Sequence, residues 1–480
     1  MCKTTNSLLP LLADTLERVI LMKTKVSFVL FLSFFLAASA LAAEPTAQSV
    51  NDSVNMTWVA IGTLLVFFMH AGFAMVESGF TRAKNTLNIL MKNFLTISIG
   101  SILYFFAGYA LMFGDSAGGF IGTSGFALAG NQDVGFFVFQ AVFAATCATI
   151  ISGAVAERMK LGSYMILTLF MTGLIYPVVG HWTWGEGWLY DLGFVDFAGS
   201  AIVHLTGAAG AVAAVMFLGA RIGKYANGKV NAIPGHSIPL GALGVFILWF
   251  GWFGFNGGST LAADPAAVPH VITTTLLAAS GGVVSSALFT YFRYGRIDPS
   301  LTLNGALGGL VGITAGADGV SFTGSILIGC IAGVILVVGV QFIDQVLKLD
   351  DPVGAIAVHG VCGVWGTLAV GLFNTSSGLF YGGGAAQLGI QAVGILAIAA
   401  WTLAATSVVT AVMKALAPIR VSKEEEISGL DYAEHGSSAY EYKESYIDQG
   451  DVDVSSAFGT DLVSRLNNLK PGPSSKTEQV

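Results

Sequence analysis

The sequence predicts an all-α polytopic membrane protein with eleven transmembrane helices: an inverted five-helix repeat (helices 1–5 and 6–10) and an eleventh helix. Composition is the first reason, because 54% of the 480 residues are hydrophobic and only 11% are charged, whereas soluble domains carry roughly a quarter of charged residues. The second reason is a series of apolar runs, each long enough to cross a bilayer. The third is the basic residues, which occur in every other loop between these runs.

The first 42 residues are predicted to be a leader. A charged segment, Met22–Lys25, precedes an apolar stretch from Val26 to Leu36 and the small residues 37–42. This order is typical of a secretory signal peptide, with cleavage expected after Ala42. Met22 is then a candidate for the true start of the protein. The alternative interpretation is an apolar stretch that is retained as a first helix.

A transmembrane domain is expected over residues 43–418, where eleven apolar runs follow the leader. They cover residues 55–79, 87–114, 134–155, 161–180, 197–220, 237–257, 266–292, 301–317, 322–346, 353–373 and 385–415. Each run has about the 17–25 residues that a transmembrane helix needs, or slightly more.

The loops between the runs predict the orientation. Loops after the odd-numbered runs hold ten basic residues, and loops after the even-numbered runs hold none. The ten are Arg82, Lys84, Arg158, Lys160, Arg221, Lys224, Lys229, Arg293, Arg296 and Lys348. Cytoplasmic loops are enriched in Lys and Arg. We therefore expect a multi-pass protein of the plasma (inner) membrane, with its N-terminus outside and its C-terminus in the cytoplasm.

Two matching stretches mark equivalent places in the two halves of the chain. Asp196–His204 and Asp351–His359 both read Asp-x-x-Gly-x-x-x-Val-His, and they begin the fifth and the tenth run. Five crossings separate them, so the second copy is inverted relative to the first. Eight helical residues rise about 12 Å, and histidines entering from opposite faces of a core about 30 Å thick nearly meet at its middle. The sequence thus predicts a His204–His359 pair deep in the membrane.

This histidine pair has three interpretations. An ionisable group inside a membrane span usually faces a polar interior or a pathway, and two neutral imidazoles can share a proton. A buried histidine can instead have a purely structural role, bonded to a carbonyl or hydroxyl group. A metal site is the third, because His359-x-x-Cys362 places two ligands on one helical face. Since no carboxylate or fourth ligand accompanies them, no metal and no other cofactor is expected.

The residues near the predicted outer face also have two interpretations each. Asp196 lies where a carboxylate caps a helix, with or without shaping a cation site. Trp184 suits an interfacial aromatic belt or cation–π capture of a small cation. Phe139 and Phe143 lie four residues apart on one helical face, where aromatic rings pack a core or line a path. The residue types alone leave these alternatives open.

Residues 419–480 are expected to form a cytoplasmic tail. The charged segment Lys423–Glu426 suits docking on the cytoplasmic face, and the last ~25 residues are typical of disorder. Most of the acidic surplus behind the net charge of −7 lies in this tail. No basic run suggests nucleic-acid binding, and the four cysteines form no disulfide framework.

Several motifs make the sequence resemble the ammonium transporter (Amt/Rh) family, closer to its Amt branch. They are DFAGSAIVHLTGAAGAVAAVMFLGAR at 196–221, HGVCG from His359, GWFGFNGGS at 251–259, AERMKL at 156–161, and GLD…HG…AY at 429–440. The resemblance extends from about residue 55 to residue 440. It implies eleven transmembrane helices in an inverted repeat, a pore through each subunit, and a homotrimer.

The resemblance also implies roles for individual residues. It implies an outer ammonium site made of Phe143, Trp184 and Ser259, which Asp196 supports. Below this site it implies a pore gate made of Phe143 and Phe255, with Phe139 nearby. It further implies a twin-histidine proton relay made of His204 and His359. His70 places a further ionisable group in the first run, with no role that the motifs assign.

We therefore predict an ammonium/ammonia transporter, not an enzyme, that takes up NH4+ from outside, deprotonates it in the pore and conducts NH3 past the twin histidines. The main alternative is an ammonium sensor or transceptor that signals through the tail. A gas channel of the Rh type and a membrane metalloenzyme are further alternatives. Expected partners are ammonium, its analogue methylammonium, membrane lipid and other copies of the chain. Binding of a PII-type regulatory protein at the cytoplasmic face is left open.

Overall fold

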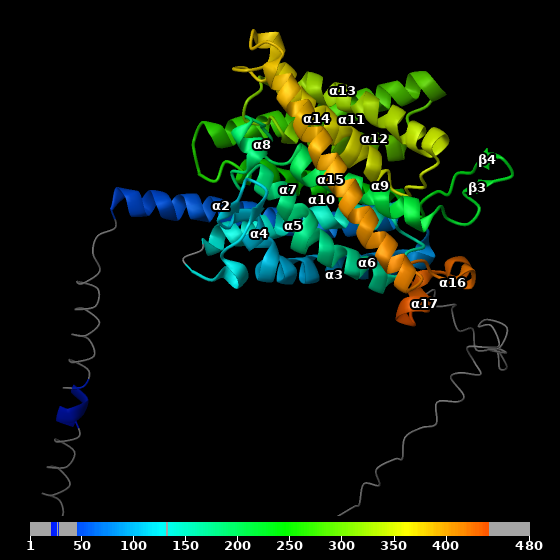
Figure 1. Cartoon of the computed structure of the whole chain (residues 1–480), viewed down its shortest axis with the longest axis horizontal. Helices are drawn as coiled ribbons and strands as arrows, with labels where there is room; N and C mark the ends of the chain where they lie inside the picture. The colour runs from blue at the N-terminus through cyan, green and yellow to red at the C-terminus, as the bar shows by residue number, and fades with distance from the viewer. Residues whose placement is uncertain (1–20, 26, 28–45, 131–132, 441–480) are drawn as a thin grey trace, which may run out of the picture.

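The computed structural model describes residues 21–25, 27, 46–130 and 133–440, and these are mostly helical (Figure 1). The predicted apolar core of the signal peptide, its cleavage site and the predicted disordered end of the tail lie outside the described residues. Ten elements in the described part are long and apolar enough to cross a membrane. The predicted all-α polytopic membrane fold is therefore confirmed.

The long elements begin and end within a few residues of most of the predicted runs. In the first half they are α2 (Ala47–Phe80), α3 with η2 and α4 (Thr86–Leu103, Tyr104–Gly108, Tyr109–Phe113), α5 (Val134–Ala154), α6 with η4 and α7 (Leu161–Phe170, Met171–Ile175, Tyr176–Trp182), and η5 with α9 (Ser200–Leu205, Thr206–Leu218). In the second half they are α10 (Ile238–Gly258), α11 (Ala267–Tyr294), α12 (Pro299–Thr314), α13 with η6 (Phe322–Gln341, Phe342–Leu347), η7 with α14 (Ile356–Val361, Cys362–Phe373), and α15 (Ala386–Leu416). α15 crosses the bundle obliquely in Figure 1.

Short elements connect the spans. They are η1 (Ala83–Asn85), β1 (Ser116–Ala117), β2 (Ile121–Gly122), η3 (Phe126–Leu128), α8 (Trp188–Asp191), β3 (Tyr225–Ala226), β4 (Lys229–Val230), η8 (Leu379–Tyr381), α16 (Lys423–Ser428) and α17 (Leu430–His435). The strands form two antiparallel hairpins, with Ser116 opposite Gly122 in one and Tyr225 opposite Val230 in the other.

The eighth predicted span differs from the other ten. α12 has only 16 residues, fewer than the ~20 that the hydrocarbon core of a bilayer needs. Asp298 caps its start by accepting a hydrogen bond from the Leu301 amide at 2.9 Å, and residues 304–314 are all buried. Helices α11 and α13 pack against it. A helix covered by protein does not have to match the lipid thickness, and the count of eleven spans stays a prediction.

Glycines allow the closest helix contacts. A Cβ on Gly79 of α2 would lie 2.4 Å from the backbone nitrogen of Gly241 on α10. A Cβ on Gly309 of α12 would lie 2.4 Å from the carbonyl oxygen of Ala278 on α11. No side chain fits at such distances, so these two helix pairs pack backbone against backbone.

The start of the tail docks on the loops that carry the basic residues; we call this end of the bundle the tail face. The Lys160 amide donates to the Ile419 carbonyl at 3.0 Å, and the Leu161 amide donates to Glu434 at 2.9 Å. Arg420 donates to the carbonyl oxygen of Ala220 at 2.7 Å. Helix α17 thus lies beside the start of α6, and both α16 and α17 lie toward the same side of Figure 1 as the β3–β4 hairpin.

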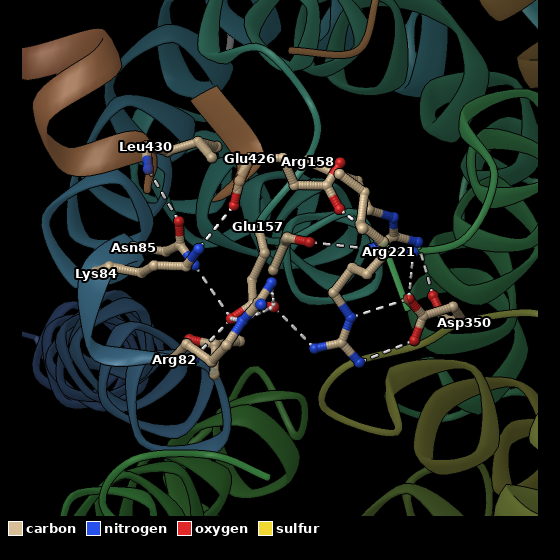
Figure 2. Close-up of polar contacts among 12 residues, drawn as sticks. Arg82, Lys84, Asn85, Glu157, Arg158, Arg221, Asp350, Glu426 and Leu430 are labelled. Atoms are coloured by element: carbon tan, nitrogen blue, oxygen red, sulfur yellow. Dashed lines mark hydrogen bonds and ion pairs between the residues drawn. The ribbon is translucent and has the colours of Figure 1, made fainter. Parts of the chain in front are cut away.

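A buried ionic network, which we call the Glu157 network, lies beneath the docked tail (Figure 2). Glu157 is fully buried and forms ion pairs with Arg82 at 2.8 Å and with Arg221 at 2.9 Å. Arg221 reaches on to Asp350 through a second ion pair of 2.8 Å. Burial opposes ionisation of Glu157, but the hydrogen bonds and charges of Arg82 and Arg221 outweigh it and lower its pKa to about 2.

The same network reaches the tail. Lys84 donates to the Glu426 carbonyl at 2.7 Å, and Asn85, which donates to Glu157 at 3.1 Å, accepts from the Leu430 amide at 3.0 Å. Glu426 is buried and bonded to Arg420 at 2.7 Å. The network therefore joins the tail to three loops and to Asp350, the residue just before the second Asp…His stretch.

Candidate functional site

The two Asp…His stretches are irregular segments followed by wide helical turns. η5 and η7, which carry the histidines, are π-helical, a geometry that is rare and frequent at functional sites. Asp196 accepts four backbone amide hydrogen bonds, from residues 199–202, at 2.7–3.0 Å. Asp351 accepts from the amides of Val353, Gly354 and Ile356 at 2.7–3.3 Å. Each carboxylate thereby accepts hydrogen bonds from backbone N–H groups of a buried segment that has no regular helix to satisfy them.

The shared Asp-x-x-Gly pattern has a conformational cause. Gly199 has φ +109° and Gly354 has φ +80°, values that strongly favour glycine. Gly354 interrupts the backbone, so η7 starts only at Ile356, three residues after the predicted start of the tenth run at residue 353. Burial raises the pKa of Asp196 to about 6, against the opposing effect of its four backbone donors.

His204 and His359 meet, as the matched stretches predict. Their Nδ1 atoms lie 3.1 Å apart, and one of them donates while the other accepts. Their ring centroids lie 5.1 Å apart with an interplanar angle of 21°. His204 is fully buried, and His359 is 4% exposed. The pair can therefore hold a proton between two rings that are shielded from bulk water.

Aromatic rings stack on the His204 side of the histidine pair. Phe143 and Phe255 lie face to face, with centroids 4.0 Å apart and an angle of 25°. His204 stacks on Phe255 at 5.4 Å and on Trp252 at 5.1 Å. Phe139 packs beside Phe143 at 4.7 Å. The rings of Phe143, Phe255, His204 and His359 thus form one continuous line.

The line continues to the loop before η5. Trp184 presents its ring to Phe143 at 6.0 Å, nearly edge-on at 76°. Its indole N–H donates to the Asp196 carbonyl at 2.9 Å, which fixes the ring. Ser259 donates its hydroxyl proton to the Phe255 carbonyl at 2.8 Å, so its lone pairs stay available to a donor. Trp184 and Ser259 are both half-buried, unlike the rings below them.

The structure brings every predicted site residue into this line or against it, and it adds Trp252. This side chain is fully buried on α10 and donates to the Thr314 hydroxyl at 2.9 Å. The signal was present in the sequence, because Trp252 belongs to the GWFGFNGGS stretch together with Phe255 and Ser259. The residue was overlooked because a tryptophan in an apolar run is usually core or interface.

Two other candidates lie elsewhere. The thiol of Cys362 contacts the Ala332 carbonyl at 3.7 Å, and no group of three or more potential metal ligands is found in the described parts of the chain. His70 is buried on α2, and both its ring nitrogens lack a hydrogen-bond partner within the described ranges.

Three cavities lead from His359 to the tail face. The innermost, of about 20 Å³, is lined by His359, Glu77 and Asn304 among others. A second of about 180 Å³ shares Asn304 with it and also touches Asp351. The third, of about 390 Å³, shares Asp351 and extends to Arg221 in the loop after α9. Open space therefore lies on one side of the histidine pair and stacked aromatic rings on the other.

These features indicate the general class to which the protein belongs. A polytopic helical bundle with a buried line of aromatic and ionisable side chains through its interior belongs among the membrane transporters and channels. A family model described as Ammonium Transporter Family matches residues 57–440. This chain belongs to the ammonium transporter family, which is a family of transporters and not of enzymes.

Individual relatives agree with that assignment. The chain is 42% identical over 442 residues to ammonium transporter Amt2 of Archaeoglobus fulgidus, covering 86% of this chain and 94% of that protein. It is 37% identical to ammonium transporter 1 member 3 of Solanum lycopersicum, covering 82% and 94%. Among solved structures, one titled Sensor Amt Protein matches with a TM-score of 0.78 and 40% identity, covering 81% and 100%. Candida albicans Mep2 matches with a TM-score of 0.73 and 31% identity, covering 78% and 87%.

Proposed function

We propose that this protein takes up ammonium across the plasma membrane by binding NH4+ at Trp184, removing its proton and conducting NH3 past His204 and His359. The observation that carries the proposal is the continuous line from Trp184 through Phe143 and Phe255 to the histidine pair. Family membership supports ammonium as the substrate, and this line supports the proposed route.

Recognition at the outer end follows from the chemistry of the three groups there. The faces of Trp184 and Phe143 attract a small cation through their π electrons. The Ser259 hydroxyl donates its proton to the Phe255 carbonyl. Its oxygen is therefore free to accept a hydrogen bond from an N–H group of the substrate. The backbone carbonyl of Asp196 holds the Trp184 ring, and its carboxylate places a negative charge behind the site. A cation such as ammonium, with four donors and no lone pair, suits this set.

The next step is deprotonation. A bare cation that passes between the buried rings of Phe143 and Phe255 loses its hydration without gaining ligands, which costs several kcal/mol or more. Neutral NH3 avoids most of this cost, so ammonium gives its proton to the histidine pair, whose His204 ring stacks on Phe255 at the gate. No other titratable group of the aromatic line is present at this depth.

Replacing Trp184 with leucine is expected to weaken selectivity for ammonium. The ring face supplies about 0.5–2 kcal/mol to a desolvated cation, equivalent to a loss of roughly twofold to thirtyfold in apparent affinity. The measurement is competition between ammonium and methylammonium in proteoliposome uptake. Trp401, whose indole donates to the Ile175 carbonyl at 3.1 Å, provides a matched Trp→Leu control. Unchanged competition in the Trp184 variant assigns this ring to an interfacial belt instead.

The membrane orientation is part of the proposal. The tail face gathers basic loops after α2, α5 and α9, which supports placing it in the cytoplasm. A reporter fused after Lys423 is expected to be cytoplasmic, and the mature N-terminus is expected near Ala43. A periplasmic reporter contradicts the orientation, whereas a cytoplasmic reporter with an uncleaved leader contradicts only the signal peptide.

A sensor role is the second candidate function. It is favoured by the likeness to the solved structure titled Sensor Amt Protein and by the docking of the tail on three loops of the bundle. Assembly as a homotrimer and binding of a PII-type regulator at the tail face stay proposals that rest on the family resemblance.

A further inference from the structure

One buried acid lies outside the line of rings. Glu77 on α2 is 2% exposed, and Lys92 on α3 is fully buried. Ionisable groups inside a membrane bundle are costly and usually functional. Glu77 was not among the residues that the sequence motifs singled out.

Glu77 is held by neutral donors and not by a direct ion pair. Its Oε2 accepts from the Ser152 hydroxyl at 2.7 Å and from the Asn93 amide at 3.2 Å. Asn93 in turn accepts from Thr149 at 2.7 Å. The Lys92 ammonium has no hydrogen-bond partner within the described residues and lies 5.7 Å from the ring centroid of Tyr164. The carboxyl group is therefore positioned by several contacts, while its charge is left without a matching ion pair.

Glu77 and His359 line the same cavity. Its volume of about 20 Å³ is close to that of a single water site, which needs at least 10–15 Å³ and two to four polar partners. Glu77, His359, Thr149 and Asn304 supply such partners. His359 uses Nδ1 for His204, which leaves Nε2 for another partner. One water can therefore join the histidine pair to the acid.

We propose that Glu77 is the proton acceptor of the histidine pair and carries the proton from His359 toward the tail face. This rests on the proposed function, in which ammonium gives its proton to the pair. Protonated His359 gives a proton to the bridging water, and the water gives one of its protons to the Glu77 carboxylate. The products are a neutral imidazole, a water and a carboxylic acid, so charge and atoms balance.

The release path follows from the neighbouring cavities. The cavity of about 180 Å³ begins at Asn304 and Val353, which also line the first cavity. It continues into the space of about 390 Å³ that reaches Arg221. A proton on Glu77 thus lies one cavity away from wide open space. The charge of Lys92 favours the ionised form of Glu77 from a distance, and this helps the acid to release its proton and become a carboxylate again.

The test compares Glu77→Gln with wild-type protein in liposomes. Glutamine keeps the shape and can still accept from Ser152, but it cannot take a proton. Ammonium-evoked current on a solid-supported membrane, normalised to folded protein, is expected to fall by about 10²-fold, the lower end of what a positioned proton acceptor contributes. Asp133→Asn is the matched acid-to-amide control, because Asp133 caps α5 away from the cavity and asparagine caps equally well. Wild-type current from folded Glu77→Gln overturns the proposal.

A second variant decides the matter if the glutamine variant does not fold. Glu77→Asp keeps an acid but draws it back by one methylene, so we expect a reduced current with a larger ratio between H2O and D2O. Unchanged current and an unchanged ratio overturn the proposal. Failure of this proposal can be distinguished from failure of the proposed function. If His359→Ala abolishes the current but the Glu77 variant does not change it, only the role of Glu77 is refuted. If wild-type protein shows no ammonium-evoked current, the relay as a whole is refuted.

Discussion

His204→Ala and His359→Ala are each expected to abolish ammonium-evoked charge movement while the protein still folds. The two rings share one hydrogen bond of 3.1 Å, and a relay needs both of them. Losing either ring leaves the other without its partner in a site that excludes bulk water. The current on solid-supported membranes is expected to fall by at least 10²-fold, within the range of a positioned acid–base group. The measurement is normalised to folded protein by size-exclusion chromatography.

The double variant separates a relay from two independent roles. Since the rings act as one unit, we expect His204→Ala/His359→Ala to lose no more current than either single variant. His270→Ala is the matched control, because that side chain bonds the Val320 carbonyl at 3.0 Å and lies outside the line of rings. A purely structural role for the pair predicts the opposite pattern: poor folding, with normal transport in the protein that does fold.

Glu157→Ala is expected to cause the largest loss of stability. It removes the carboxylate between Arg82 and Arg221, and breaking a buried ion pair typically costs about 3–5 kcal/mol. Because Asp350 still pairs with Arg221 through two hydrogen bonds, we expect about 3 kcal/mol, the low end of that range. The readouts are thermal unfolding in detergent and the rate of proteolysis within the tail. Glu424→Ala removes an exposed acid of α16 and should change neither.

The Glu157 network also predicts a pH dependence. Glu157 and Asp350 both have pKa values lowered to about 2 from 4.5 and 3.8. A depressed acid stabilises the fold fully above its unfolded pKa, and this contribution is lost as the pH falls through the folded pKa. Thermal stability is therefore expected to be flat above about pH 5 and to fall steadily toward pH 2. Glu157→Gln should flatten the acid limb; an unchanged limb would show that other carboxyl groups determine it.

Much of the fold could be predicted because membrane helices are recognisable from composition alone. The predicted limits of the third run, 134–155, differ from α5 by a single residue. The helix rise from Asp196 to His204 was predicted wrongly, since η5 begins only at Ser200. The histidines still meet because the segment before η5 is itself buried, with Asp196 6% exposed. The depth of the histidines in the bundle thus comes from an irregular buried segment before the helix. A hydropathy pattern does not distinguish such a segment from a helix.

What the sequence could not reveal depends on contacts between distant helices. Glu77 was overlooked because its partners Asn93 and Ser152 lie on α3 and α5, and no local spacing links them to His359. The length of α12 was predicted closely, at 17 residues against 16, but an apolar run does not show whether lipid or protein surrounds it. The Glu157 network was also not foreseen, since its charges were counted as loop charges although Glu157 and Arg221 are buried.

The most direct test of the account is uptake by purified wild-type protein in liposomes after an ammonium concentration jump. We expect an inward current that requires ammonium, saturates with its concentration, is competed by methylammonium and is not evoked by K+. Internal pH should stay nearly constant, because NH3 and the proton that arrive together recombine to NH4+ inside; a rise in internal pH without current would show that NH3 enters without its proton. Ammonium binding with neither current nor uptake would contradict transport and leave a sensor.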